Sequence, residues 1–215
     1  MNPDIAFALG SAPEPARSRM QALWSLDDAL GRVLASGREA MVTRIRLAWW
    51  REALERLDRE APPKEPVLEG VAARLIPAGI SGLELAQMEA GWLAVVGDQP
   101  ISADELGTYA ANRGGLLFRL SALLLEQPAT EVVAAGEAWA LVDLARHSIE
   151  SSDVAAALAA ARERPLPRRW STKLRPLGML AALAARDLDR GPESWEAPGI
   201  PPRIARMLRH RLTGF

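Results

Sequence analysis

Two adjacent aspartates, Asp27 and Asp28, are of a residue type that suits catalysis. Carboxylates at helical spacing can hold Mg²⁺ against the oxygens of phosphate groups. One turn after this pair, however, the sequence has Gly31 and Arg32, so no further carboxylate follows on the same helix face. Asp27 and Asp28 are therefore candidates for catalysis that lack an acidic partner on their own helix.

A second group, Asp143, His147 and Glu150, has the spacing of one helix face. Carboxylate and imidazole groups both bind divalent metals. A solvated polar face shows the same pattern, and this is the interpretation that we favour. Asp143 and Glu150 remain candidates for catalysis. No residue is assigned to a metal, and Mg²⁺ is expected as a cofactor only if the chain is catalytic.

The composition excludes several other kinds of active site. The 215 residues include no cysteine, which excludes disulfides and thiolate metal sites. The two histidines, His147 and His210, are accompanied by no nucleophile elbow, P-loop or G-x-G-x-x-G motif. The formal net charge of −1 gives no overall attraction to nucleic acid, so no nucleic-acid partner is expected.

The C-terminal segment 203–212 predicts a basic amphipathic helix, with Arg203, Arg206 and Arg209 or His210 next to apolar residues. Such a helix can lie on an anionic membrane or dock its apolar side on its own domain. We favour docking, and a peripheral membrane contact through 203–212 stays open. No apolar run reaches the ~18 residues of a membrane span, and no signal peptide is evident, so a cytoplasmic location is expected.

Helices must position these residues, because the sequence is rich in Ala, Leu, Arg and Glu and shows no sustained alternating pattern. Apolar spacing, prolines and glycines predict helices over 15–35, 39–60, 67–76, 80–96, 102–126, 130–150, 153–164, 174–190 and 204–212. Short loops favour antiparallel neighbours. We expect an all-α fold, with a flexible N-terminus over 1–14 and a single helical domain over 15–215.

The predicted helix 102–126 carries two local signals. Ser102 and Glu105 have the spacing of a capping box. Gly114 and Gly115 lie in its middle, where each costs ~1 kcal/mol relative to alanine. The glycine pair therefore indicates a kink or a close contact between backbones, made either for helix packing or for a pocket.

Two stretches, ALWSLDDALGRV at 22–33 and IRLAWWREAL at 45–54, resemble the squalene/phytoene synthase family of head-to-head isoprenyl diphosphate synthases. Further stretches follow in the family's order over about residues 15–190: PVLEGVAARL, ISADELGTYAANRGGLLFRLSALLL, GEAWALVDLARHSIE, RERPLP and MLAALAARDLDR. The resemblance implies an all-α isoprenoid-synthase fold around a central apolar cavity. It also implies that active members join two allylic diphosphates, with Mg²⁺ held by two aspartate-rich motifs on facing helices.

The sequence departs from this pattern at both acidic motifs. One turn after Leu26, where the first motif is expected, the residues are Leu30, Gly31 and Arg32. In the second motif, His147 stands in place of the leading aspartate, Ser151 stands in place of the closing one, and Glu150 is the remaining acid. We therefore expect a family member with degenerate motifs that is non-catalytic. The alternative is an active prenyltransferase that uses Asp27, Asp28, Asp143 or Glu150.

The IRLAWWREAL stretch is more similar to one branch, the phytoene-synthase-like proteins related to the mitochondrial assembly factor for respiratory complex I, than to active synthases. This resemblance implies a protein partner in respiratory-complex assembly, near the inner membrane, or an isoprenoid or lipid ligand. A purely structural protein with a collapsed cavity is a third interpretation.

Adjacent helical residues point about 100° apart, so Trp49 and Trp50 cannot share one narrow core stripe. We expect one of them to pack in the core and the other against a neighbouring helix or the cavity rim. The residues expected to bind a ligand or partner are Arg46, Trp49, Trp50, Tyr109, Arg146 and His147.

Overall fold

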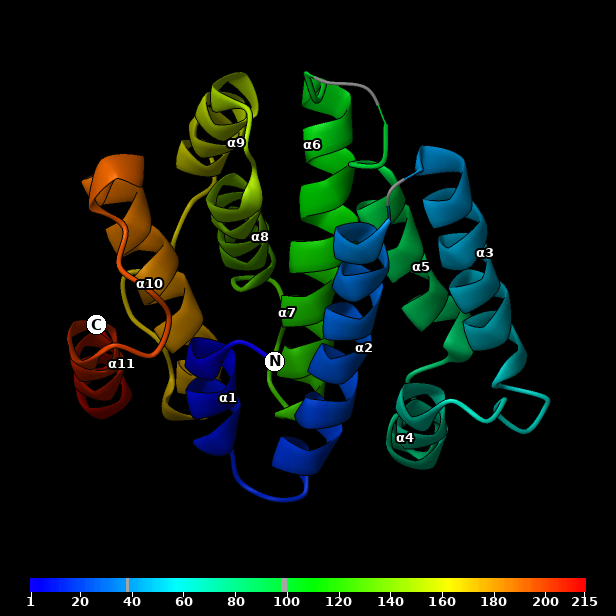
Figure 1. Cartoon of the computed structure of the whole chain (residues 1–215). Helices are drawn as coiled ribbons and strands as arrows, with labels where there is room; N and C mark the ends of the chain where they lie inside the picture. Colours follow the sequence, from blue (N-terminus) through cyan, green and yellow to red (C-terminus); the bar gives the residue numbers. More distant parts are fainter. Residues whose placement is uncertain (38, 98–99) are drawn as a thin grey trace.

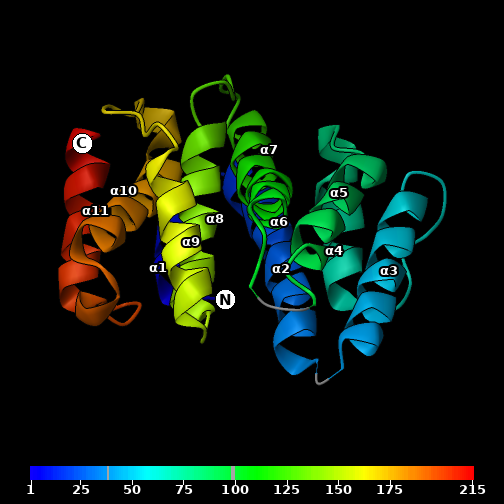
Figure 2. The same ribbon diagram turned by 90° about the horizontal axis from the view of Figure 1, so that it is seen from above.

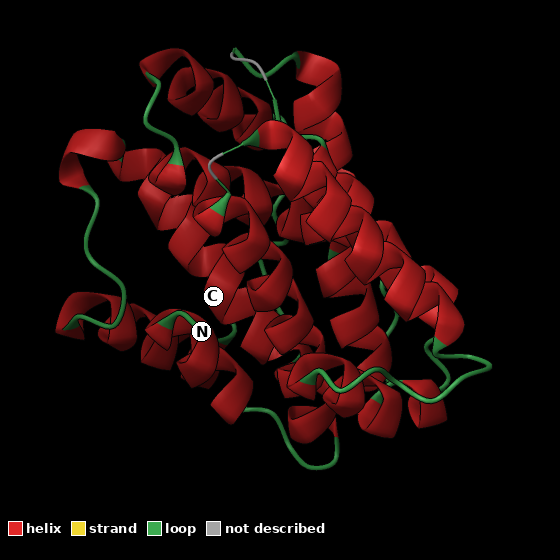
Figure 3. Cartoon of the chain, turned by 45° about the vertical axis from the view of Figure 1, so that its right-hand side comes forward, coloured by secondary structure: helices red, strands yellow, loops and turns green. Residues whose placement is uncertain are grey.

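The computed structural model describes residues 1–37, 39–97 and 100–215. These residues form helices and loops and contain no strand (Figure 3), which confirms the predicted all-α class. The α-helices are α1 (Pro3–Gly10), α2 (Ala16–Ser36), α3 (Ala40–Arg56), α4 (Pro66–Arg74), α5 (Gly82–Leu93), α6 (Ala103–Tyr109), α7 (Leu116–Leu124), α8 (Val133–His147), α9 (Ser151–Arg162), α10 (Arg175–Arg190) and α11 (Pro201–Thr213). Shorter helical segments are η1 (Ile76–Ala78), η2 (Ala110–Gly115), η3 (Thr172–Leu174) and η4 (Pro192–Ser194).

The helices are arranged around a central group made of α2, α6, α7 and α8 (Figure 1). Helices α3 and α5 lie on one side of this group, and α10 and α11 lie on the other. Seen from above, the helices spread from α11 at one end of the molecule to α3 at the other (Figure 2). No helix in the described part of the chain is both long enough and apolar enough to cross a membrane.

Helix α2 forms because its apolar residues recur at helical spacing and face the core. The buried stripe includes Met20, Leu23, Leu26, Leu30 and Val33. Between them, Trp24 packs its ring 5.0 Å from that of Trp139 on α8 and 6.2 Å from that of Phe118 on α7. The Trp24 indole also donates a hydrogen bond to Ser121 Oγ at 3.0 Å. These rings fill part of the space between α2, α7 and α8.

The predicted helix 102–126 is interrupted by one π-helical segment, η2, between α6 and α7. Helix α6, the first part of this stretch, begins at the predicted capping box of Ser102 and Glu105. Both reciprocal hydrogen bonds of the box are present. A Cβ atom added to Gly114 would lie 2.1 Å from the carbonyl oxygen of Gly136 on α8, and one added to Gly136 would lie 2.2 Å from that of Gly114. Gly114 and Gly136 therefore let the backbones of η2 and α8 come into close contact, one of the outcomes that the Gly114–Gly115 pair predicted.

The predicted flexible N-terminus is wrong for most of its length. Asn2 caps α1, Pro3 occupies its first turn, and Asp4, Ala8 and Leu9 are buried. Asp4 accepts a hydrogen bond from Arg203 Nε of α11 at 2.8 Å and another from the backbone N–H of Gly199 at 2.9 Å. Because this buried ion pair ties α1 to the far end of the chain, residues 3–10 belong to the packed domain.

Two further expectations about helix faces need correction. Helix α8 ends at His147, and Glu150 lies beyond it as the residue that precedes α9, so Glu150 does not continue the face of Asp143 and His147. On α11, Arg203 and His210 are buried together with Met207. The expected basic face therefore loses two members, because α11 turns them toward its own domain.

Candidate functional site

A cavity of about 780 Å³ opens among α2, the end of α5, α6 and the end of α8. Its apolar walls include Ile5, Leu34, Val95, Ile101 and Leu144. Its polar lining includes all four acidic residues that the sequence offered for catalysis, namely Asp27, Asp28, Asp143 and Glu150, together with Tyr109 and His147. The helices thus bring together acids that are far apart in the sequence.

Arg113 of η2 lies between two of these acids. Its Nε donates to Asp27 Oδ1 at 3.0 Å, and one terminal nitrogen donates to Asp27 Oδ2 at 3.1 Å. The other terminal nitrogen donates to Asp143 Oδ2 at 2.7 Å and also to the Tyr109 hydroxyl. Asp27 on α2 and Asp143 on α8 are therefore bridged by one guanidinium group.

Aromatic rings enclose this guanidinium. Its central carbon lies 4.3 Å from the ring centroid of Trp92, 4.8 Å from that of Trp139 and 5.4 Å from that of Tyr109. These separations suit cation–π attraction, which is strongest where water is excluded. Arg113 itself is only 4% exposed, so the charge lies in the interior.

The Asp27 carboxylate accepts a third hydrogen bond, from the Trp92 indole N–H at 3.0 Å. Three N–H donors on two oxygens suit the ionised carboxylate. Burial raises the pKa of the Asp27 carboxyl, and the nearby Asp143 charge adds to this, while Arg113 and Trp92 oppose the rise. Burial alone would lower the pKa of Arg113, but Asp27, Tyr109 and Asp143 more than offset this effect, and its pKa lies well above the ordinary value.

Gly31, one turn after Asp27, has a structural role. A Cβ atom added to Gly31 would lie 2.9 Å from the Trp92 ring, so Gly31 makes room for the indole that bonds Asp27. Asp28 pairs with Arg32 at 2.5 Å, one turn along α2, and with the N-terminal ammonium of Met1 at 3.3 Å. The two adjacent aspartates thus have different environments, because neighbouring residues on a helix face different directions.

The remaining predicted binding residues fall into two groups. Tyr109 and His147 line the cavity, and the His147 side chain is 70% exposed. Arg46, Trp49 and Trp50 do not line it. Trp50 is buried in the core, as expected for one of the two tryptophans, whereas Trp49 is 46% exposed and borders a shallow groove on α3 with Glu52 and Arg56.

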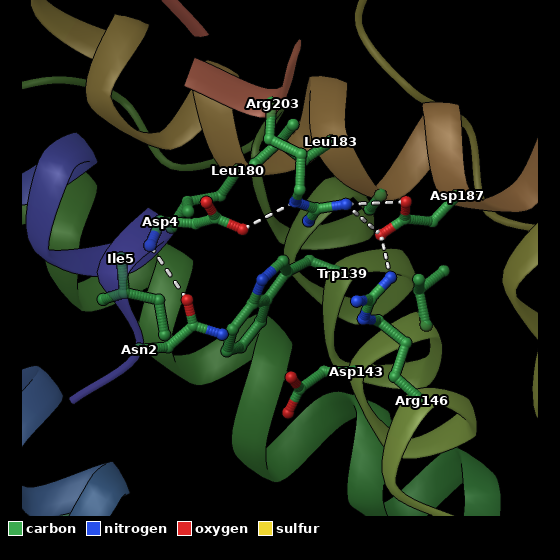
Figure 4. A pocket seen from close by; sticks show the side chains of 12 residues that line it. Asn2, Asp4, Ile5, Trp139, Asp143, Arg146, Leu180, Leu183, Asp187 and Arg203 are labelled. Atoms are coloured by element: carbon green, nitrogen blue, oxygen red, sulfur yellow. Dashed lines mark hydrogen bonds and ion pairs between the residues drawn. The ribbon is translucent and has the colours of Figure 1, made fainter. Parts of the chain in front are cut away.

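Arg146 lines a polar pocket next to the cavity, which shares Asn2, Ile5 and Asp143 with it (Figure 4). It donates to Asp187 Oδ2 of α10 at 3.0 Å, and Asp187 also accepts from Arg203 at 2.8 Å. Arg203 in turn pairs with Asp4, so charges alternate from α8 through α10 and α11 to α1. This chain of ion pairs explains Arg146 as a residue that holds helices together.

Sequence reasoning missed Arg113 and Trp92, the two partners that define the environment of Asp27. One signal for Arg113 was present: it is the one charged residue in the apolar stretch 106–118, it is four residues from Tyr109, and it precedes the glycine pair. An isolated charge at such a place indicates a buried, paired group. Trp92 carried no comparable signal, since a tryptophan in an amphipathic helix is ordinarily core.

The sequence matches the squalene/phytoene synthase family over residues 3–190. The chain therefore belongs to this family, and its helical architecture is the isoprenoid-synthase-like fold that the resemblance implied. No curated protein and no solved structure shows a significant match.

Family membership raises the question whether the site fits Mg²⁺, and the residues around Asp27 do not fit it. Within the described ranges, no group of three or more histidine or acidic side chains is arranged to hold a metal ion. Asp27 and Asp143 already share a buried guanidinium, and a divalent cation would compete with it for the same oxygens. We therefore assign no chemical step to Mg²⁺ at this site.

Proposed function

We propose that this chain is a non-catalytic member of the squalene/phytoene synthase family that binds an apolar, isoprenoid-like ligand in its central cavity. The observation that carries the proposal is the bridge from Asp27 through Arg113 to Asp143. Departure of a diphosphate requires cations that stabilise the leaving charge. Here the buried cation is already neutralised by two carboxylates, which leaves it little free charge to offer.

The charge of the cavity supports the same proposal. Four carboxylates line it, against three cationic groups, namely the guanidinium groups of Arg32 and Arg113 and the N-terminal ammonium of Met1. A diphosphate anion is therefore repelled on balance, whereas an uncharged prenyl chain gains free energy by burying apolar surface against Leu34, Val95 and Ile101. Binding in this cavity should depend on the length of the apolar chain and not on Mg²⁺.

A titration with farnesol and with farnesyl diphosphate, each with and without Mg²⁺, tests this proposal. The tryptophans that line the cavity provide a fluorescence signal. We expect farnesol to bind equally well in both conditions and Val95→Trp, which fills the cavity, to weaken binding. Leu83→Trp is the matched control, because Leu83 is 63% exposed on α5 and does not line the cavity. Binding that requires both the diphosphate and Mg²⁺ would contradict the proposal and favour an active prenyltransferase.

A protein partner is the second candidate, because α3 exposes a row of apolar side chains. Met41, Ile45 and Trp49 are 67%, 63% and 46% exposed and follow each other at intervals of four residues along the helix. Such a row fits helix-in-groove recognition. This role is in line with the resemblance of residues 45–54 to the complex I assembly branch. Loss of a partner from affinity purifications of Trp49→Ala would support it, with Leu83→Ala as the control variant, because Leu83 is an exposed apolar residue on another helix, α5.

A further inference from the structure

We propose that the outward face of helix α11 and the neighbouring loop 163–171 dock on an anionic lipid surface. This basic surface is made of six exposed residues: Arg168, Arg169, Leu208, Arg209, Arg211 and Leu212. It lies at the end of the molecule where Figure 2 shows α11, and no residue of α11 lines the cavity of about 780 Å³. Lipid docking here is therefore independent of ligand binding in that cavity.

Charge is distributed unevenly along the chain, and the basic surface lies in its positive part. Segments 164–186 and 197–215 contain ten arginine and lysine residues and no aspartate or glutamate. The formal net charge of the whole chain is −1, so the other residues carry a net charge of −11. A positive end on an otherwise acidic protein indicates an anionic partner.

Hydrogen bonds join the loop to the end of α11, so that the two segments present one surface. The backbone N–H of Trp170 donates to the carbonyl oxygen of Gly214 at 3.0 Å. The Arg175 side chain donates to the carbonyl oxygens of Arg211 and Leu212 at 2.8 and 3.1 Å. The loop arginines next to Trp170 are therefore held beside those of α11.

The four arginines of the basic surface carry charges that the fold leaves uncompensated. Among the residues that the structure describes, none of the four forms an ion pair with an acidic side chain. On the inner face of the same helix, by contrast, Arg203 pairs with Asp4 and Asp187. Helix α11 thus uses Arg203 to dock on its own domain and leaves Arg209 and Arg211 exposed, where phosphate groups can reach them.

Two exposed leucines lie between the arginines of α11. Leu208 and Leu212 are 42% and 78% exposed and lie one turn apart on the same helix face. At ~3.6 residues per turn, Arg209 and Arg211 fall on opposite sides of this pair. The outward face is therefore an apolar stripe with a basic border on each side, which is the pattern of a helix that lies in a membrane interface.

A lipid surface is the occupant that satisfies both kinds of side chain. The leucines can enter the boundary of the acyl chains while the arginines contact lipid phosphates. Nucleic acid would pair with the arginines but leave the leucines in water. A second copy of the chain in a two-fold contact would set arginines against arginines, because such a contact joins identical patches.

Cosedimentation of the wild-type chain with lipid vesicles tests this docking. The vesicles contain phosphatidylcholine alone, or phosphatidylcholine and phosphatidylserine in equal amounts. We expect the wild type to sediment with the mixed vesicles and to remain free with phosphatidylcholine alone. High salt should release it from the mixed vesicles, because screening weakens the attraction between exposed charges.

A double variant probes the arginines. Arg209→Gln with Arg211→Gln should bind the mixed vesicles about 25-fold more weakly, since each arginine near an anionic leaflet contributes about fivefold. The matched control is Arg59→Gln with Arg74→Gln, because both of these arginines are exposed, lie outside the basic segments and lower the net charge by the same amount. This control should bind like the wild type.

A single variant probes the leucines. Leu212→Ser should weaken binding to the mixed vesicles by about tenfold, because less apolar surface leaves water on docking. Leu83→Ser is its matched control, since Leu83 is 63% exposed on α5 and lies outside the basic surface. It should bind like the wild type.

Lipid docking is overturned if the wild type does not sediment with the mixed vesicles, or if it binds both kinds of vesicle equally. Equal binding by the arginine double variant and its control overturns it too. If Leu212→Ser binds like the wild type, or if the wild type binds duplex DNA but not the mixed vesicles, the surface serves a polyanion without an apolar part. None of these results bears on the cavity, because no prenyl ligand is present.

Discussion

Comparison of Asp27→Asn with Asp28→Asn tests whether Asp27 is a partner in an internal ion pair or a catalytic acid. The two roles predict opposite signs for the change in the free energy of unfolding of Asp27→Asn. The two substitutions are chemically identical and adjacent in α2. Asp27 is 3% exposed and bonds Arg113 and Trp92, whereas the Asp28 side chain is 30% exposed and bonds Arg32. Their effects on the free energy of unfolding should therefore differ strongly.

The expected magnitude for Asp27→Asn comes from the buried pair. Loss of one partner of a buried ion pair costs ~3–5 kcal/mol, because the other charge stays buried without compensation. Asp143 still contacts Arg113 in this variant, so the lower end applies, about 3 kcal/mol, or ~6–12 °C in Tm for a chain of this length. Asp28→Asn removes an exposed i, i+4 pair with Arg32 and a partly exposed pair with the N-terminal ammonium of Met1, and should cost only ~0.5–1 kcal/mol.

Urea unfolding followed by tryptophan fluorescence measures both values in the absence of divalent cations. A catalytic acid that waits for a metal has no permanent counter-ion, so its neutralisation would relieve repulsion and raise stability. Asp27→Asn with a stability equal to or above that of the wild type would therefore refute the role assigned to Arg113.

Other substitutions test the packing and the pH dependence of the fold. Gly114→Ala should lower the free energy of unfolding by about 3 kcal/mol or more, because the added Cβ meets the α8 backbone. Gly107→Ala is the control and should raise it by ~0.5–1 kcal/mol, because its Cβ meets nothing within 4 Å. Equal unfolding midpoints of the two variants in urea would count against the contact between η2 and α8. Burial lowers the pKa of His210 below its ordinary 6.5, and Arg175 and Arg206 add to this, so the unfolded chain binds a proton more readily than the folded one. Stability should therefore fall as the pH drops from about 7 to about 5. That fall should shrink in His210→Gln but persist in the exposed-site control His147→Gln.

Much of the helical framework was predictable because apolar spacing and helix boundaries are local properties. The buried stripe of α2, the capping box at Ser102 and the close approach at Gly114 were all readable from neighbouring residues. Helix α1 was missed although Asn2 and Pro3 form a local start signal. Its packing depends on Arg203, at the other end of the chain, and no local pattern shows that partner.

The site was predictable only in part, because it depends on which distant residues converge. The sequence singled out Asp27, Asp143 and Tyr109, which do lie together around Arg113. It treated Arg46 and Trp49 as binding residues on the strength of a motif, and these lie outside the cavity. The isolated charge of Arg113 in an apolar stretch indicated a buried, paired group, but its two partners could be assigned only once both carboxylates had been placed.

A product assay tests directly whether the chain is catalytic. The wild-type chain is incubated with Mg²⁺ and farnesyl or geranylgeranyl diphosphate, and the organic extract is analysed by mass spectrometry. We expect no condensed prenyl product and no release of diphosphate above a control without protein. A condensed product that disappears in Asp27→Asn and in Asp143→Asn would contradict it, because these carboxylates would then serve a metal rather than Arg113.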